Sequence, residues 1–161
     1  MFGLFKKKEE KGSFEKLIPV MAGEVVSIDQ VPDAVFSQKM LGDGFAVKPT
    51  NGTVVSPVDG TIVQIFPTNH AFGILTDSGL EILVHIGIDT VDLKGEGFKR
   101  LVEPDTKVKA GEPIVEVDLA FVGERAKSLI TPVVITNKEK VKQMTTHYGA
   151  NLPVAAEIEI N

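Results

Sequence analysis

Residues 80–91, LEILVHIGIDTV, decide the fold class of this sequence and contain its most informative histidine. Side chains alternate between two faces along a β-strand. Positions 82, 84, 86 and 88 are all Ile or Val, so they form the face expected to be buried. The opposite face carries Glu81, Leu83, His85, Gly87 and Asp89. We therefore expect His85 to point away from the core, beside a glycine that leaves room next to the imidazole.

The rest of the chain contains many short β segments. Val, Ile, Thr and Phe dominate these segments, and Gly, Pro, Asp or Asn separates them. Strands so closely spaced predict an all-β fold, an antiparallel β-sandwich or distorted barrel, rather than alternating strand–helix units. The expected strands are residues 24–28, 44–49, 52–57, 60–66, 71–76, 81–88, 97–102, 113–119, 131–136 and 153–160.

Helical signals are few and short. Residues 33–40 are expected to form one or two turns with Asp33 as the N-cap, because Asp33 follows a proline and precedes apolar residues. Residues 121–130 and 138–144 are two further short candidates. None of these helices is long enough to organise the core.

After about residue 16, no linker or low-complexity block divides the chain. We expect a flexible tail over residues 1–17 and a single β-sandwich domain over residues 18–161. The tail composition favours a solvated segment. A weak contact with an anionic membrane surface is the alternative, although each basic residue would add only about 1 kcal/mol. The residues that suggest it are Phe2, Leu4, Phe5 and Lys6 to Lys8.

Composition excludes several classes of protein. The chain has 161 residues, no cysteine and a formal net charge of −5. Without cysteine there is no disulfide, no thiolate metal site and no thiol nucleophile, which is compatible with the cytoplasm. The acidic balance argues against nucleic-acid binding. No apolar stretch approaches the roughly 18 residues of a transmembrane helix.

A second histidine, His70, lies in the segment IFPTNHAF. If this segment pairs with residues 81–88 through the TDSG turn, paired residue numbers should sum to 155–157. His70 would then lie opposite or diagonal to His85, and both could reach a shared group. Phe66 and Leu83 would surround the pair with apolar surface. The third histidine, His147, lies near a predicted turn and is expected to be a surface residue.

Two imidazoles on a half-apolar face leave three interpretations open. The first is a purely structural pair. The second is a zinc site, because His85 and Asp89 have His-x-x-x-Asp spacing and both groups are zinc ligands. A catalytic zinc needs three protein ligands, and no His-x-His follows. A zinc-binding domain or hydrolase using His70, His85 and Asp89 would have two histidine ligands, and Asp89 is a weak third one, so the ligand set is incomplete.

The third interpretation is phosphoryl relay through histidine. A neutral imidazole nitrogen can attack phosphorus if an acceptor holds the proton on the other nitrogen. A neighbouring imidazole or hydroxyl can stabilise charge on the phosphoryl oxygens. His85, with His70 and Thr68 nearby, has the expected setting, but spacing alone does not choose among the three interpretations.

Four segments carry a resemblance to a known family. They are VFSQKMLGDGFAVKP (35–49), PVDGTIVQIFPTNHAFGI (57–74), VHIGIDTVDLKGEGF (84–98) and TPVVITN (131–137). Together they resemble the glucose-type enzyme IIA of the bacterial phosphoenolpyruvate-dependent sugar phosphotransferase system, from about residue 18 to the C-terminus. The resemblance implies a β-sandwich or distorted barrel of the duplicated hybrid type with a few short helices.

The resemblance also implies a role for each site residue. His85 matches the histidine that the phosphocarrier HPr phosphorylates at Nε2 and that passes the phosphoryl group to a cysteine of a IIB domain during sugar uptake. His70 matches the second histidine, which is needed for donation rather than acceptance, and Thr68 supports it. Gly87 is the candidate for the backbone carbonyl that bonds the other nitrogen of His85. Asp33 and Asp89 match nearby carboxylates.

Partner contacts follow from the same resemblance. An apolar docking ring is expected at Val35, Phe36, Met40, Leu41, Phe66, Leu83 and Val91. No cofactor is required, although some family members bind zinc through the two histidines and a carboxylate of a partner. The short ends of the sequence favour a free-standing cytoplasmic protein, and sugar choice is expected to lie in the membrane IIC domain.

A carrier domain is the remaining alternative. SPVDGTIVQI and VKAGEPIVEVD resemble half-barrel repeats of biotinyl and lipoyl domains, which present a modified lysine on a hairpin. No Met-Lys-Met or Asp-Lys-Ala hairpin lies between these segments, so this alternative is the weaker one.

Overall fold

The computed structural model describes residues 13–161. Its largest sheet has eight strands, and every pairing in it is antiparallel. The strands are, in spatial order, β13 (Gly149–Ala150), β2 (Gly23–Ser27), β3 (Asp43–Pro49), β11 (Thr131–Ile135), β7 (Glu81–His85), β6 (Ala71–Leu75), β5 (Gly60–Ile65) and β9 (Thr106–Val108). Because β13 and β9 remain as separate edges, the sheet is open and the fold is a sandwich rather than a closed barrel.

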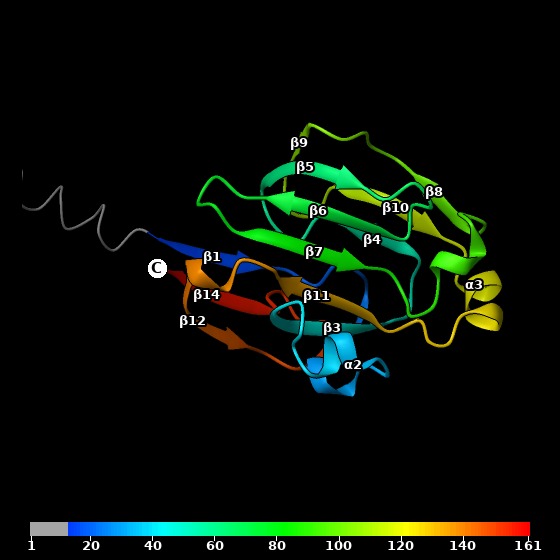
Figure 1. Cartoon of the computed structure of the whole chain (residues 1–161), viewed down its shortest axis with the longest axis horizontal. Helices are drawn as coiled ribbons and strands as arrows, with labels where there is room; N and C mark the ends of the chain where they lie inside the picture. Colours follow the sequence, from blue (N-terminus) through cyan, green and yellow to red (C-terminus); the bar gives the residue numbers. More distant parts are fainter. Residues whose placement is uncertain (1–12) are drawn as a thin grey trace, which may run out of the picture.

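Two three-stranded antiparallel sheets complete the sandwich (Figure 1). One consists of β1 (Phe14–Leu17), β14 (Ala156–Ile160) and β12 (Val141–Thr146), and the other of β4 (Thr53–Val55), β10 (Pro113–Val117) and β8 (Phe98–Arg100). Helices α2 (Ala34–Ser37) and α3 (Leu119–Arg125) and the 3₁₀ turns η1 (Ile28–Gln30), η2 (Val91–Leu93) and η3 (Lys138–Lys140) lie in the connections.

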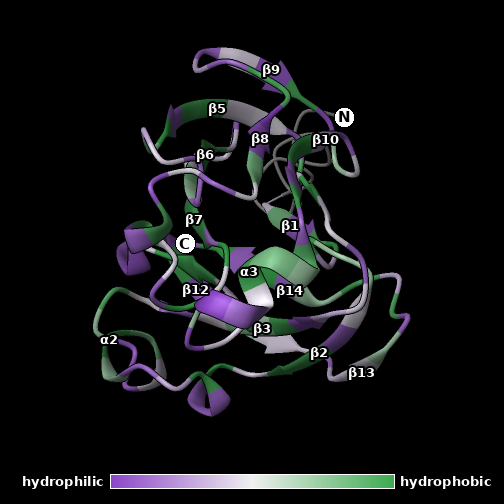
Figure 2. Ribbon diagram, turned by 90° about the vertical axis from the view of Figure 1, so that its right-hand side faces the viewer, coloured by the Kyte–Doolittle hydropathy of each residue, from purple (hydrophilic) through white to green (hydrophobic). Residues whose placement is uncertain are grey.

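The apolar residues form two buried clusters. The larger fills the space between the sheets and includes Phe45, Phe72, Ile82 and Ile114. The smaller lies under α2 and joins Phe36 to residues of η1 and the large sheet. Figure 2, viewed at right angles to Figure 1, shows hydrophobic and hydrophilic residues alternating along several strands. One face of each such strand therefore reaches the interior while the other meets solvent.

The predicted alternation in β7 is confirmed. Ile82, Val84, Ile86 and Ile88 are all buried, whereas Leu83 and His85 are half-buried. The predicted register is also confirmed, since Ala71 pairs with His85 and Phe72 with Val84, which gives sums of 156. The alternating pattern and the TDSG turn therefore predicted the register between β6 and β7 correctly.

Asp33 is the N-cap of α2, as predicted, and its Oδ1 accepts from the backbone N–H of Val35 at 2.9 Å. The expected helix over residues 121–130 instead begins at Leu119, where Asp118 caps it, and ends at Arg125. Beyond it, Ser128 forms an isolated bridge with Ile88, so this part of the chain is extended.

The expected helix over residues 138–144 is wrong. Only Lys138–Lys140 form a 3₁₀ turn, and residues 141–146 form β12, which pairs with β14. Val141, Thr145 and Thr146 are β-branched and fit a strand when a partner is available. The pairing with a strand near the C-terminus therefore outweighs a weak local helical signal.

Three other strands were not expected: β1, β9 and β13. Strand β1 occupies the last four residues of the segment predicted to be a tail, where Phe14 to Leu17 pair with β14. The residues proposed to meet a membrane, Phe2, Leu4, Phe5 and Lys6 to Lys8, lie outside the described residues. No helix in residues 13–161 is long and apolar enough to cross a bilayer.

Candidate functional site

His85 is the last residue of β7, and a hydrogen bond fixes its ring. Its Nδ1 lies 2.8 Å from the carbonyl oxygen of Gly87. Because a carbonyl can only accept, Nδ1 carries the proton and the lone pair is on Nε2. The expected role of Gly87 as the backbone acceptor therefore has the required geometry.

Gly87 is held in a conformation that other residues rarely adopt. Its φ is +71°, in the left-handed region, and a Cβ added there would lie 2.7 Å from Thr90 Cγ2 and 3.0 Å from the Ser128 carbonyl oxygen. A glycine at this position thus allows both the turn and the carbonyl direction that His85 needs.

Two buried threonines that the sequence analysis missed hold this turn. The Thr90 hydroxyl donates to the Ile86 carbonyl at 2.7 Å, and the Gly87 N–H donates to the Thr131 hydroxyl at 3.3 Å. Both threonines are fully buried. Thr90 lies in the DTV segment just before η2, and Thr131 begins β11 in the LITPVV segment, but neither local sequence shows that its hydroxyl holds the turn at Gly87.

His70 lies at the end of the β5–β6 loop, next to the first residue of β6. Its Nδ1 is 2.5 Å from the Thr68 hydroxyl, and its side chain is buried with only 4% of its surface exposed. The two atoms share one proton, and either tautomer of His70 satisfies the bond. The predicted contact between Thr68 and His70 is therefore present.

The two imidazoles are neighbours. Their ring centroids lie 5.0 Å apart and the rings are nearly perpendicular, at 81°. Phe66 meets His70 edge-on at 5.5 Å, and Phe36 contacts His85 at 5.1 Å. The strand register and the loop together thus place two histidines within one apolar surround.

Both histidines are uncharged at neutral pH. Burial, and to a smaller extent the neighbouring His85, lowers the pKa of His70 to about 4. Burial also lowers the pKa of His85, while the Gly87 carbonyl, then Asp33 and Asp89, partly offset this effect. A neutral imidazole has a nucleophilic lone pair, so the environment keeps His85 Nε2 in the reactive form.

The carboxylates of Asp33 and Asp89 lie close enough to act electrostatically on His85. Asp33 is half-buried and caps α2, whereas Asp89 is exposed and has a φ of +59°. Both carboxylates raise the pKa of His85 and so favour the protonated, positively charged form of its ring.

A comparison of the sequence with models of protein families shows which family the chain belongs to. The model of a family described as phosphoenolpyruvate-dependent sugar phosphotransferase system, EIIA 1, matches residues 15–141. The chain belongs to this family. The match contains both histidines and confirms the resemblance found in the sequence.

Several members of the EIIA family are similar over most of the chain. The glucose-specific EIIA component of Staphylococcus aureus is 45% identical over 98% of this chain and 96% of that protein. The corresponding component of Haemophilus influenzae is 48% identical over 91% of this chain and 88% of that protein. The solved glucose permease IIA from Mycoplasma capricolum has a TM-score of 0.84 and 41% identity, and the match covers 89% of this chain and 95% of that chain.

Longer relatives contain the same region. The N-acetylglucosamine-specific EIICBA component of Klebsiella pneumoniae is 57% identical over 78% of this chain, but the match covers only 19% of that protein. The chain thus spans most of the EIIA components and about a fifth of the EIICBA component. These comparisons, together with the solved structure, confirm the antiparallel sandwich fold and do not support a zinc hydrolase or a biotinyl or lipoyl carrier.

The expected docking ring is largely exposed, with one exception. Val35, Met40, Leu41 and Val91 are exposed, and Phe66 and Leu83 are half-buried. Phe36 is buried, with 5% of its surface exposed, and packs in the smaller cluster and against His85. Its expected surface position is therefore wrong, because α2 turns Phe36 inward while Val35 and Met40 face solvent.

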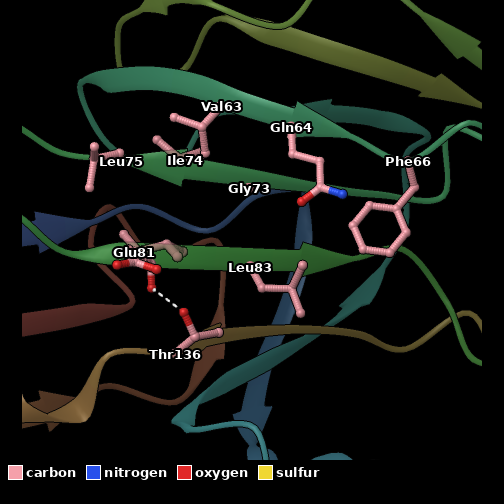
Figure 3. A pocket seen from close by; sticks show the side chains of 10 residues that line it. Val63, Gln64, Phe66, Gly73, Ile74, Leu75, Glu81, Leu83 and Thr136 are labelled. Atoms are coloured by element: carbon pink, nitrogen blue, oxygen red, sulfur yellow. Dashed lines mark hydrogen bonds between the residues drawn. The ribbon is translucent and has the colours of Figure 1, made fainter.

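A shallow groove extends from this site along the sheet (Figure 3). It has a volume of about 260 Å³, and its lining is mostly apolar. Phe66 and Leu83 lie at the end nearer the histidines, while Leu75, Glu81 and Thr136 lie at the other end. At that end the Thr136 hydroxyl donates to the Glu81 carbonyl at 3.3 Å. Phe66 and Leu83, two members of the expected ring, thus also line the groove.

Metal ligands are few at the site. In residues 13–161, no three His, Cys, Asp or Glu side chains gather as a metal site would require. Since Nδ1 of each histidine is already bonded, only the two Nε2 atoms are available as ligands. At this site, residues 13–161 thus offer two imidazole ligands, fewer than a zinc site needs.

Proposed function

We propose that this chain carries a phosphoryl group on Nε2 of His85, between the phosphocarrier HPr and a cysteine of a IIB domain. The hydrogen bond between His85 Nδ1 and the Gly87 carbonyl is the observation that carries the proposal. It leaves the lone pair on Nε2 and stabilises the positive charge that the ring acquires as the N–P bond forms.

The arrangement allows two transfer steps, from HPr to His85 and from His85 to the IIB cysteine. The Nε2 lone pair attacks phosphorus on the phosphohistidine of HPr, and the donor N–P bond breaks with its electron pair left on the donor nitrogen. In the second step a cysteine thiolate attacks the same phosphorus, and the pair of the His85 N–P bond returns to Nε2. No oxidant or cofactor is needed, because the reaction only exchanges bonds to phosphorus.

His70 is proposed to act mainly in the second step. If the Thr68 hydroxyl donates to Nδ1, then His70 carries its proton on Nε2 and can donate to a phosphoryl oxygen. A neutral donor fixed beside the phosphoryl group stabilises the charge that develops during transfer. Its lowered pKa keeps His70 neutral in the unphosphorylated chain.

Partner docking is proposed to use the exposed ring and the groove. Val35, Met40, Leu41 and Val91 supply apolar contact, and Asp33 and Asp89 favour a basic partner. We place the reaction in the cytoplasm, with sugar choice made by the permease. A zinc ion would bind only with further ligands from a partner, and membrane contact by the N-terminal tail stays a prediction on residues outside the described ones.

The test is incubation with phosphoenolpyruvate, enzyme I and HPr, followed by mapping of the phosphorylated residue. We expect an acid-labile phosphate on His85 alone. His85→Ala should abolish acceptance, whereas His70→Gln should accept normally and deliver slowly to IIB. Phosphate on another residue, or equal loss of both steps in His70→Gln, would contradict the assigned roles.

A further inference from the structure

An arginine on another sheet holds the loop that carries Thr68 and His70. Arg100 is the last residue of β8, which pairs with β10 rather than with any strand of the large sheet. Its Nε donates to Asn69 Oδ1 at 2.9 Å, and its Nη2 donates to the Phe66 carbonyl at 3.4 Å. The guanidinium therefore spans the two ends of a single turn.

The turn itself has a conformation that needs support. It closes through a hydrogen bond from Asn69 N–H to the Phe66 carbonyl at 2.8 Å. Asn69 has a φ of +60°, a left-handed conformation that asparagine tolerates but that is not its most stable one. Because His70 follows Asn69 directly, any relaxation of this residue would turn the His70 ring.

Besides His85, two neighbours of the His70 ring lie on the same turn. Thr68 bonds its Nδ1, and Phe66 meets the ring edge-on. Arg100 bonds the residue before His70 and the carbonyl of Phe66, so it acts on both contacts without touching the imidazole.

The guanidinium group of Arg100 is well suited to holding the 66–69 turn. Guanidinium donors are held in a rigid plane and can engage two acceptors at once, whereas a lysine ammonium is a point charge on a flexible stem. The third bond, from Nη1 to Glu103 at 3.1 Å, is made on the solvent side, where Glu103 is largely exposed. It orients the guanidinium but does not reach the turn.

We propose that Arg100 is a positioning residue for phosphoryl delivery, which acts by fixing the 66–69 turn so that Thr68 and His70 keep their mutual geometry. The inference rests on the proposed function of His70. It extends the site to a residue on a separate sheet, 30 positions beyond His70 in the sequence.

The first experiment needs no partner. Ring nitrogen chemical shifts of His70, measured by ¹⁵N NMR as a function of pH, report its tautomer and its pKa. We expect the parent chain to show one tautomer and a strongly lowered pKa, and Arg100→Ala to show tautomer averaging with a pKa moved toward 6.5. Glu103→Gln is the matched control, because it removes the negative charge of the solvent-side partner of Arg100 and leaves the turn bonded.

The second experiment separates acceptance from delivery. Arg100→Ala should accept phosphate from HPr within about twofold of the parent rate. It should deliver the phosphate to IIB about tenfold more slowly, because His70 would be misaligned. Arg100→Lys should be intermediate, and Asn69→Gly should resemble Arg100→Ala because it removes the acceptor while glycine tolerates the same φ. Should Arg100→Ala fold poorly, Asn69→Gly and Arg100→Lys still decide the question.

Failures of the two proposals can be told apart. If His70→Gln delivers at the parent rate, the role of His70 is wrong, yet the NMR result still tests the turn. If His70→Gln is slow but Arg100→Ala delivers normally with unchanged His70 spectra, the positioning role is overturned. Equal losses in acceptance and delivery, with a lowered melting temperature, would also overturn it, since they indicate a structural role only.

Discussion

His70 and His85 have rings 5.0 Å apart, and a different oxygen binds Nδ1 of each. A backbone carbonyl holds His85, while the hydroxyl of Thr68 holds His70. A carbonyl fixes one tautomer absolutely, but a hydroxyl is able to donate or accept. The Gly87 carbonyl therefore sets the tautomer of His85, whereas the direction of the Thr68 hydrogen bond decides which nitrogen of His70 carries the proton.

Thr68→Val should slow delivery of the phosphoryl group about tenfold while acceptance changes little. Valine has nearly the same shape, but it leaves the buried Nδ1 of His70 without a partner. The loss of that partner should also cost about 1–3 kcal/mol of unfolding free energy. Single-turnover rates for the two half-reactions and urea denaturation measure both effects. Thr68→Ser, which retains the hydroxyl, should behave like the parent chain, and a slow Thr68→Ser would argue against the hydrogen bond as the cause.

The stability of the fold should decrease as the pH falls below about 6.5. The pKa of His70 is lowered to about 4 in the folded chain, so the unfolded chain binds more protons between these values. Stability is therefore full above pH 6.5 and is lost on acidification toward pH 4. From pH 7.5 to pH 5 this one group should remove about 2 kcal/mol, with His85 adding a further loss in the same direction.

Urea midpoints at a series of pH values in one buffer system measure this dependence. His70→Gln should flatten the slope in this window, because the replacement does not titrate. Carboxylates contribute mainly at lower pH, so the comparison is best made above pH 5. An equally steep slope in His70→Gln would assign the effect to other groups.

Sequence reasoning located the two histidines because their signals were local. The alternation of Ile and Val in residues 82–88 set the face of His85, and the TDSG turn set the register. The family resemblance implied the roles of Thr68, two positions from His70, and of Gly87, two positions from His85. Such short spacings can be evaluated without knowing how distant segments meet.

The remaining parts of the site depend on distant segments. Thr131 reaches Gly87 across 44 positions, and Arg100 reaches Asn69 across 31. Neither distance leaves a periodic pattern in the sequence. Phe36 was expected in the docking ring because of the family resemblance, and α2, with only four residues, is too short for an apolar stripe to show that this side chain is buried. Residues 138–144 were expected to be helical from a weak local pattern, which does not show that residues 141–146 pair with β14.

Gly87→Ala should destabilise the fold and slow acceptance at His85. The alanine Cβ would require a strained φ and would meet Thr90 and the Ser128 carbonyl, so the turn would shift and its carbonyl would leave His85 Nδ1. We expect a loss of about 2–4 kcal/mol from strain and overpacking together. Urea denaturation and the rate of phosphorylation by HPr are the measurements.

Gly111→Ala is the matched control for that change. Gly111 has a similar φ of +90°, but only Ile18 Cδ1, at 3.9 Å, lies near its Cβ position, and it is exposed. It should lose about 1 kcal/mol and keep the parent rate of phosphorylation. If both alanine variants lose equal stability and equal activity, the contacts around Gly87 have no special role.

Met40 and Phe36 should respond in opposite ways to substitution. Met40 is exposed over 68% of its surface, so Met40→Asp should weaken binding of HPr and IIB while the unfolding free energy stays within about 0.5 kcal/mol of the parent. Phe36 is buried against His85, so Phe36→Ala should cost about 3–5 kcal/mol by opening a cavity. The substrate concentration dependence of transfer, with HPr or IIB varied, and urea denaturation separate the two. Gln38→Asp is the control, because it adds the same charge to an exposed position of the same segment that is not apolar. Met40→Asp would contradict the docking surface if its KM for both partners matched that of Gln38→Asp.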